Sequence, residues 1–187
     1  MALWSEADIL AWQRERLKPG RLAHVLAVQE TCRELAARYG MDARQASLAG
    51  LIHDCAKSLS PDQLRALLVA RKRFFPEDAG QAPVWHAPAG AILARETFGV
   101  EDPEVLDAVA CHTLGRLDMS QLDKVLYCAD MIAPGRDFPG VEALRRRRLD
   151  GLDGLLLSCM GHTLAYLAGQ GCRIHPVSFR VYNAYAT

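Results

Sequence analysis

The chain has 187 residues, half of them apolar and 24% charged, which is typical of a globular domain with a substantial core. Lys plus Arg equals Asp plus Glu at 22 each, so bulk attraction to nucleic acid or an anionic membrane is not expected. No apolar run approaches the roughly 20 residues needed to cross a bilayer, and the first residues lack the pattern of a secretory signal. We therefore expect one cytoplasmic domain spanning residues 1–187.

The six cysteines contain no Cys-x-x-Cys pair, and most of them lie inside apolar helical patterns. A reduced cysteine in such a position behaves as a small hydrophobic residue. Neither a disulfide framework nor a thiolate zinc site is expected, which agrees with a reducing compartment.

Apolar residues recur with a helical period along most of the chain. Ser5, Asp42 and Ser60 stand where N-caps would begin helices, and Gly40 and Gly99 where helices would end. The sequence therefore predicts an all-α protein, a helical bundle whose site lies between facing helices. We expect helices at about 5–16 (packed on the core through Trp4 and Trp12), 21–40, 43–57, 60–73, 85–98, 103–113, 122–132, 138–149 and 150–169, a loop at 74–83, and a short C-terminal segment at 174–187.

The expected helix at 43–57 ends in a His-Asp pair followed by a lysine, His53-Asp54 and Lys57. Neighbouring helix positions are turned by roughly 100°, so the pair would share an ion only if other segments closed over it. An imidazole beside a carboxylate suits a divalent transition metal, and the second carboxylate oxygen is free to bridge to another ion. Alone, the dipeptide is weak evidence, because an ordinary helix end has the same residues.

Further histidines and one aspartate repeat this placement near helix ends. Any one of these histidines would more often be a core or surface residue than a ligand. Their joint occurrence across five successive helices, around a His-Asp pair, favours a metal centre. The set is His24, His53, Asp54, His86, His112 and Asp130, whereas His162 and His175 lie outside the pattern and are interpreted as structural.

The order H…HD…H…H…D resembles that of the HD-domain metal-dependent phosphohydrolases. The segments His86–Gly90, His112-Thr113-Leu114-Gly115 and Ala129–Arg136 resemble more narrowly the YqeK-type bacterial members, and the resemblance covers about residues 18–185. It implies a symmetrical bis(5′-nucleosyl)-tetraphosphatase, which cleaves diadenosine tetraphosphate into two ADP at a di-iron centre. Val25 and Leu114 depart from the usual pattern, but neither removes a ligand type.

Carried over by this resemblance, His24, His53, Asp54 and Asp130 would hold one metal. His86 and His112 would hold the second, with Asp54 bridging as a catalytic residue. Two ions roughly 3.5–4 Å apart can hold a hydroxide nucleophile and polarise phosphoryl oxygens. Because no cysteine is among the ligands, iron, manganese or cobalt is expected and not a structural zinc. Of the three metals, iron is expected first.

Substrate contacts are expected from residues beside these ligands. Lys57 would be catalytic, neutralising charge on the transferred phosphoryl group. Arg136 would contact phosphate in a bidentate manner, unless it is a surface residue in a turn. Thr113 and the Gly115 backbone would contact phosphate or close the turn after His112. Arg21 would hydrogen-bond near the site, unless it is a solvated residue at a helix start.

Other functions fit the same residues less well. The substrate could be a nucleoside monophosphate or cyclic nucleotide, and a di-iron oxygenase is a further alternative. A non-catalytic nucleotide sensor is disfavoured because it would not need six ligands. Expected partners are the nucleotide, with ADP or GDP as product, and a second copy in a homodimer. The four arginines at 145–148 are interpreted as a solvated helix face.

Overall fold

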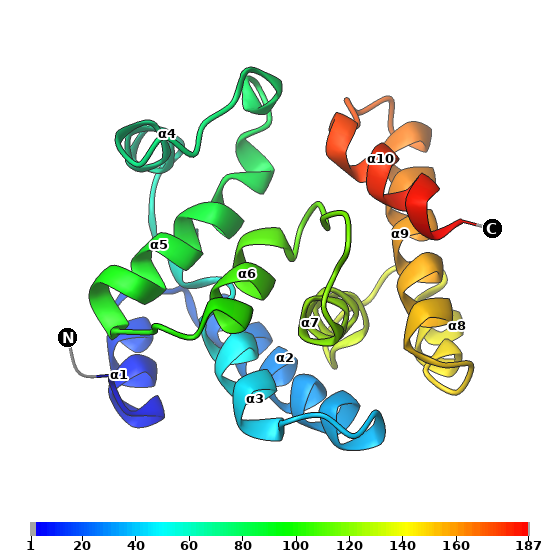
Figure 1. Ribbon diagram of the computed structural model, residues 1–187, viewed down its shortest axis with the longest axis horizontal. Coiled ribbons are helices and arrows are strands. Elements are labelled where there is room, and N and C mark those ends of the chain that lie inside the picture. Colours follow the sequence, from blue (N-terminus) through cyan, green and yellow to red (C-terminus); the bar gives the residue numbers. More distant parts are fainter. Residues whose placement is uncertain (1–2, 187) are drawn as a thin grey trace.

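The computed structural model describes residues 3–186, all of whose regular elements are helices (Figure 1). The predicted all-α class is confirmed. The extreme ends of the expected domain, residues 1–2 and 187, lie outside the described residues. The α-helices are α1 (Glu6–Arg16), α2 (Pro19–Arg38), α3 (Ala43–Ile52), α4 (Pro61–Ala70), α5 (His86–Phe98), α6 (Pro103–Cys111), α7 (Gln121–Ile132), α8 (Val141–Arg147), α9 (Leu152–Gly169) and α10 (Pro176–Tyr185), and the 3-10 turns are η1 (Cys55–Ser58), η2 (Pro76–Asp78) and η3 (Ala82–Val84).

The first helix begins and packs as its sequence predicts. Ser5 accepts a hydrogen bond from the Asp8 amide, which caps α1. The rings of Trp4 and Trp12 lie 5.6 and 5.2 Å from that of Phe98, so both indoles hold α1 against the end of α5. Aromatic pairs at such separations stabilise a fold beyond their simple burial.

The helices α2 and α3 run side by side and pack unusually closely at Gly50. A Cβ atom at this position would lie 2.7 Å from the Cα of Gln29, which no real side chain tolerates. The glycine therefore allows α3 to approach α2 directly. This approach brings the end of α3 beside the first turns of α2, where His24 lies.

The predicted helix at 43–57 is wrong beyond Ile52, where α3 ends. Asp54 has φ −105° and ψ 12°, outside the helical region, and the amide of Lys57 donates to its carbonyl over 2.9 Å to form η1. Such a tight turn redirects side chains at a helix end. His53 and Asp54 are consequently released from the helical spacing that would have separated their faces.

The interpretation of the arginine run as a solvated face is wrong for its first member. Arg145 donates hydrogen bonds to the carbonyls of Ile132, Ala133 and Arg136 at 2.9 Å each. It thereby fixes the turn that follows α7, while the other three arginines of the run are exposed. A guanidinium with several donors in one plane is suited to binding converging carbonyls.

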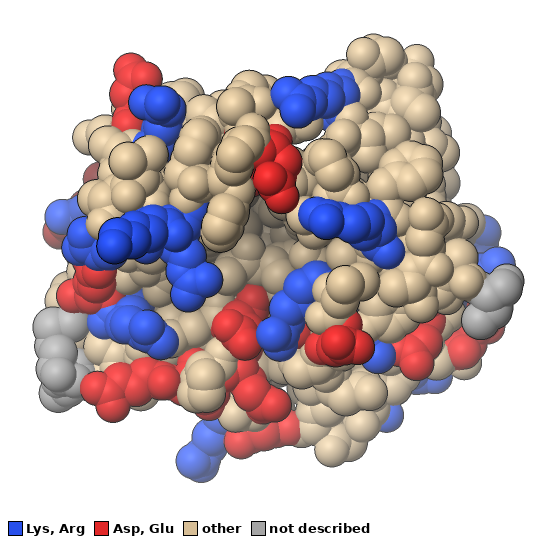
Figure 2. All heavy atoms as spheres, turned by 45° about the horizontal axis from the view of Figure 1, so that its top comes forward, with Lys and Arg blue, Asp and Glu red and all other residues tan. Residues whose placement is uncertain are grey.

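The surface carries both charge signs in close mixture. On the face seen in Figure 2, acidic side chains lie among the basic ones, and Lys and Arg flank a central hollow. Among residues 3–186, no helix is long and apolar enough to cross a membrane.

Candidate metal centre

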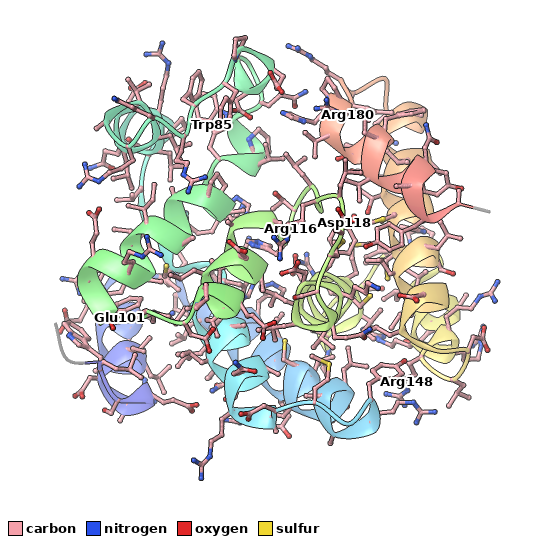
Figure 3. All side chains as sticks on the ribbon, in the orientation of Figure 1. Trp85, Glu101, Arg116, Asp118, Arg148 and Arg180 are labelled. Carbon is pink, nitrogen blue, oxygen red and sulfur yellow. The ribbon has the colours of Figure 1, made fainter. Side chains whose placement is uncertain are left out.

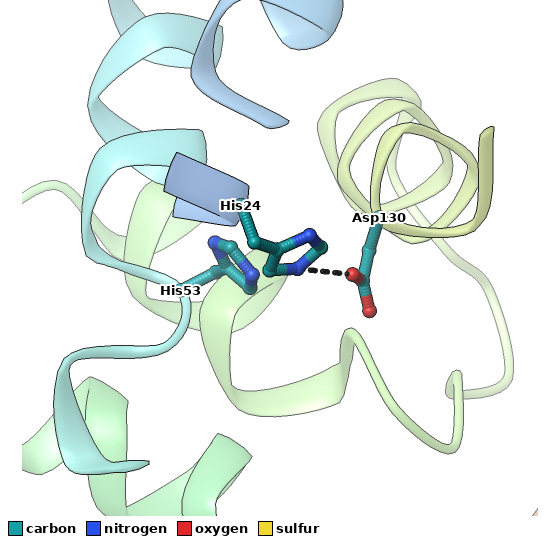
Figure 4. Close-up of side chains that lie close together, drawn as sticks. All are labelled: His24, His53 and Asp130. Atoms are coloured by element: carbon teal, nitrogen blue, oxygen red, sulfur yellow. Dashed lines mark ion pairs between the residues drawn. The ribbon is translucent and has the colours of Figure 1, made fainter. Parts of the chain in front are cut away.

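Six side chains converge from five helices at one place. His24 lies in α2 and Asp130 near the end of α7, and Figure 4 shows both beside His53. Ligand atoms of these three residues lie within 4.8 Å of one another, as do those of His53, Asp54 and His112. His86 is the first residue of α5, and its Nε2 lies 3.2 Å from Asp54 Oδ1. The structure thus brings together all six residues that the sequence singled out.

Three of the histidines are oriented by the same backbone device. The Nδ1 atoms of His53, His86 and His112 lie 2.7, 2.8 and 2.7 Å from the carbonyl oxygens of Gly50, Pro83 and Val109. Each carbonyl stands three residues before its histidine. Because a carbonyl can only accept, each Nδ1 carries the proton and each Nε2 presents a lone pair to the centre. These carbonyl partners were not predicted from the sequence, although each lies three residues before a histidine at a helix end.

Asp54 divides its two oxygens between two groups of residues. Its Oδ1 lies 3.2 Å from His86 Nε2 and 3.9 Å from His112 Nε2. Its Oδ2 lies 3.5 Å from His53 Nε2 and 3.9 Å from His24 Nε2. The side chain is 3% exposed. A carboxylate in this position can bridge two ions, one on each side.

The nitrogen atoms at the centre require a cation. His53 Nε2 is buried without a hydrogen-bond partner among the described residues. The Nε2 atoms of His86 and His112 face each other at 3.2 Å. With both Nδ1 atoms protonated, two lone pairs meet there, which is unfavourable unless a proton or a metal ion is shared. The donor set therefore fits a divalent metal.

The pKa values of His86 and His112 argue against a proton as the cation between them. Burial, assisted by the neighbouring His86 and His53, lowers the pKa of His112 to about 3. Burial likewise lowers the pKa of His86. Burial opposes charging of His53 too, but the Asp54 carboxylate raises its pKa overall. His86 and His112 are hence neutral near pH 7, the form in which imidazole binds metals.

The two carboxylates are ionised. Burial alone would raise the pKa of Asp54, but His53 and His86 hold it well below its usual range. For Asp130, burial is likewise outweighed, first by the hydrogen bond with His24, whose Nε2 lies 2.9 Å from Oδ1. Two anionic oxygen donors beside neutral imidazoles match the preference of divalent transition metals.

Three cations surround the mouth of the centre. Arg21 Nη1 donates to Asp54 Oδ2 over 2.8 Å. Arg136 donates from Nε to the Asp130 carbonyl over 2.7 Å and from Nη2 to the Asp130 carboxylate. Partial burial lowers the pKa of Lys57. Arg21 and Arg136 lower this pKa too, whereas Asp54 and Asp130 raise it. Positive charge is thereby concentrated where an anionic substrate would meet the metals.

The two residues expected after His112 occupy other environments. The amide of Gly115 donates to the Cys111 carbonyl over 2.7 Å, and its φ of +72° ends α6. This N–H is therefore not free to bind phosphate. Of the two roles expected for the Gly115 backbone, closing the turn after His112 fits the structure. Thr113 lines a groove of about 380 Å³ together with Trp85 and His175, outside the ligand cluster.

The cysteines beside the ligands are buried and unpaired, as expected. Burial raises the pKa of the Cys55 thiol to about 12 and also raises those of Cys111 and Cys128. They are accordingly protonated and serve as packing behind the ligands.

The chain is similar to known proteins along most of its length. Residues 21–135 match the HD domain family. The chain is 35% identical over 177 residues to the symmetrical bis(5′-nucleosyl)-tetraphosphatase of Bacillus subtilis, covering 94% of this chain and 95% of that protein. It is 37% identical over 173 residues to the enzyme of the same name from Halalkalibacterium halodurans, covering 91% of each.

A solved structure has the same fold over nearly the whole chain. The crystal structure described as a predicted HD superfamily hydrolase involved in NAD metabolism, from Clostridium acetobutylicum, superposes with a TM-score of 0.95 at 34% identity and covers 98% of both chains. This chain belongs to the HD domain family and, within it, to the family of the symmetrical bis(5′-nucleosyl)-tetraphosphatases.

Proposed function

We propose that the protein hydrolyses dinucleoside polyphosphates and cleaves diadenosine tetraphosphate symmetrically into two ADP. The names of the relatives from Bacillus subtilis and Halalkalibacterium halodurans support this substrate. The observation that carries the proposal is the placement of the Asp54 carboxylate, whose Oδ1 faces His86 and whose Oδ2 faces His53. A bridging carboxylate between two imidazole groups is the arrangement that two-metal phosphate chemistry requires.

Two divalent ions, iron first and manganese or cobalt as alternatives, are proposed as cofactors. His24, His53, Asp54 and Asp130 would hold one ion, and His86 and His112 the other with Asp54 shared. When bound, such ions lower the pKa of water and polarise phosphoryl oxygens. The purely nitrogen and oxygen donor set supports these metals over a structural zinc.

The cations of the chain bind and orient the polyphosphate. Arg21 lies on the Oδ2 side of Asp54, and Arg136 lies on the other ligand carboxylate, Asp130. Their planar guanidinium groups can turn from carboxylate to phosphate oxygens when substrate enters. The exposed Lys57 would neutralise charge that develops on the leaving phosphate.

A cavity beside the centre supports a substrate with two nucleosides. It has a volume of about 870 Å³ and lies between α2 and α8. Arg136 lines it and also contacts Asp130, so the cavity begins one side chain away from the ligands. Phe138 and Pro134 offer apolar surface there for a purine. A nucleoside monophosphate bound at the metals would leave this volume unused.

The remaining expectations concern location and assembly. We propose a cytoplasmic location, which the five buried, unpaired cysteines support. A homodimer stays a prediction that sedimentation equilibrium of the purified protein tests.

The test is anaerobic purification with Fe(II), counting of metal per chain, and chromatography of the products from diadenosine tetraphosphate. Two metals per chain and ADP as the sole product are expected. Asp54→Ala should lose shared metal binding and essentially all turnover, whereas Asp62→Ala on the exposed start of α4 should retain both. Two metals with intact substrate would contradict the substrate assignment and direct the search to mononucleotides and oxygen consumption.

A further inference from the structure

His175, which lies outside the ligand pattern, joins the C-terminal helix to a distant loop. It is the N-cap of α10 and 3% exposed, and its Nδ1 accepts from the amide of Val177 over 3.2 Å. The proton must then be on Nε2, which lies 3.2 Å from Asp78 Oδ1. The ring is thus occupied at both nitrogens and links residues 97 positions apart.

Two further contacts join the same segments. Arg173 donates from Nη1 to the Ala79 carbonyl over 3.0 Å. Arg180 and Glu77 form an exposed pair at 3.8 Å, which contributes little by itself. Figure 3 shows the two sides, with Trp85 labelled on the side of α5 and Arg180 on α10. The His175–Asp78 contact is the least exposed of the three connections, with side chains 3% and 16% exposed, so water competes least for it.

Asp78 connects this contact to the ligand His86. Its Oδ2 accepts from the Phe75 amide over 2.7 Å, and its carbonyl accepts from Trp85 Nε1 over 2.9 Å. Trp85 is buried and directly precedes His86. The imidazole of His86 is in turn oriented by the Pro83 carbonyl of the same loop. The loop at 74–84 therefore sets both the position and the rotation of this ligand.

We infer that His175 is a positioning residue for the metal ligand His86, acting through Asp78 and the loop at 74–84. This inference rests on the proposed metal centre. A partner of a ligating imidazole typically changes metal affinity by roughly 10–100-fold when removed. Because His175 acts through the loop rather than on the imidazole itself, the loss should be near the lower limit. The ion on the side of His24 and Asp130 should be unaffected.

The test compares His175→Asn with His162→Asn. Asparagine is a good N-cap and preserves the start of α10, but it is too short to reach Asp78. His162 packs on Phe138 at 4.8 Å, away from the loop, and is the matched control. Both proteins are studied without metal by hydrogen–deuterium exchange and then by titration with Mn(II).

His175→Asn should exchange faster at residues 76–86 and bind the second ion about tenfold more weakly, with first-ion affinity unchanged. Excess metal should restore kcat, and KM should stay the same. His162→Asn should match wild type in exchange at residues 76–86 and in affinity for both ions. Asp78→Ala, which also removes the hydrogen bond from the Phe75 amide, should give losses at least as large, and the double variant should not exceed those of Asp78→Ala.

Unchanged affinity for both ions in a folded His175→Asn would overturn the inference. If this variant does not fold, Arg173→Ala leaves the cap intact and weakens the same connection, and there too unchanged affinity and exchange would overturn it. Failure of the proposed substrate would leave these measurements intact, because neither metal titration nor exchange depends on hydrolysis.

Discussion

Arg21 and Asp54 form an ion pair between Nη1 and Oδ2 at 2.8 Å, in which the arginine is 37% exposed and the carboxylate only 3%. A cation on the solvent side thus meets the most buried charge of the centre. The same guanidinium is in place for a polyphosphate that approaches Asp54 from solvent.

Arg21→Ala should therefore weaken substrate binding without removing metal. Hydrogen bonds to charged groups contribute about 1.5–3 kcal/mol, so KM for diadenosine tetraphosphate should rise roughly 10–100-fold. Arg14→Ala, on the exposed face of α1, is the control. Kinetics and metal counting on both variants provide the check. Loss of metal in Arg21→Ala, with KM unchanged, would show that the arginine serves only to hold Asp54.

Lys57→Ala should retain both metals and lower kcat. The lysine is exposed at the mouth of the centre, and removal of one donor to developing charge typically costs about 10²–10³-fold in kcat. Lys57→Arg should recover part of the rate because it keeps the charge. Steady-state kinetics with Lys72→Gln as control measure the effect. Reduced metal content in Lys57→Ala would mean that the lysine supports the ligands instead.

Ala143→Trp should block the cavity beside Arg136. Ala143 lines this cavity and is exposed, so a larger side chain there should fill it without disturbing the core. KM for diadenosine tetraphosphate should rise at least about tenfold, the effect of losing roughly 1.4 kcal/mol of binding. Hydrolysis of bis(p-nitrophenyl) phosphate, which is too small to reach the cavity, should not change. Ala143→Ser is the control, and equal losses for both substrates would exclude a nucleoside at this place.

The stability of the metal-free protein should fall in acid because of His112. Its pKa of about 3 in the folded protein lies below the ordinary histidine value of about 6.5 that applies to the unfolded chain. Between these values the unfolded state binds more protons, so stability is full above pH 6.5 and is lost as the pH falls toward 3. From pH 6.5 to 5 this residue should cost about 2 kcal/mol of unfolding free energy.

Urea unfolding of wild type and His112→Gln at both pH values isolates this effect. His53, whose pKa is raised, and His86, whose pKa is lowered, are present in both proteins, so the difference between the two losses reports His112 together with its coupling to them. The variant should show the smaller loss in acid. Equal losses in the two proteins would mean that His112 is protonated in the folded state.

Gly115→Ala should reduce stability and leave KM unchanged. An added Cβ would lie 2.9 Å from Val181 Cγ1, in addition to requiring the left-handed φ of +72°. Overpacking of this kind costs about 1–3 kcal/mol. Gly40→Ala shares a positive φ, here +70°, but meets nothing within 4 Å, so it should lose only the smaller cost of the backbone. A raised KM with unchanged stability would instead show that Gly115 contacts substrate.

The sequence by itself determined most of the helices and which side chains form the cluster. Ser5, Asp42 and Ser60 cap the helices that they were predicted to begin, because capping is a hydrogen bond within three residues of the chain. The histidine and aspartate residues of the cluster could be found because their residue types and order are themselves the signal.

Only the tertiary structure decided how these residues meet. α3 ends at Ile52, and Asp54, which follows it, is paired with Arg21 on another helix. Arg145 donates to carbonyls of a turn that lies beside it only in the folded chain, and His175 contacts Asp78, 97 residues away in the sequence. Helix periodicity and caps are local, whereas these contacts depend on which distant segments pack together, and no single stretch of sequence contains that information.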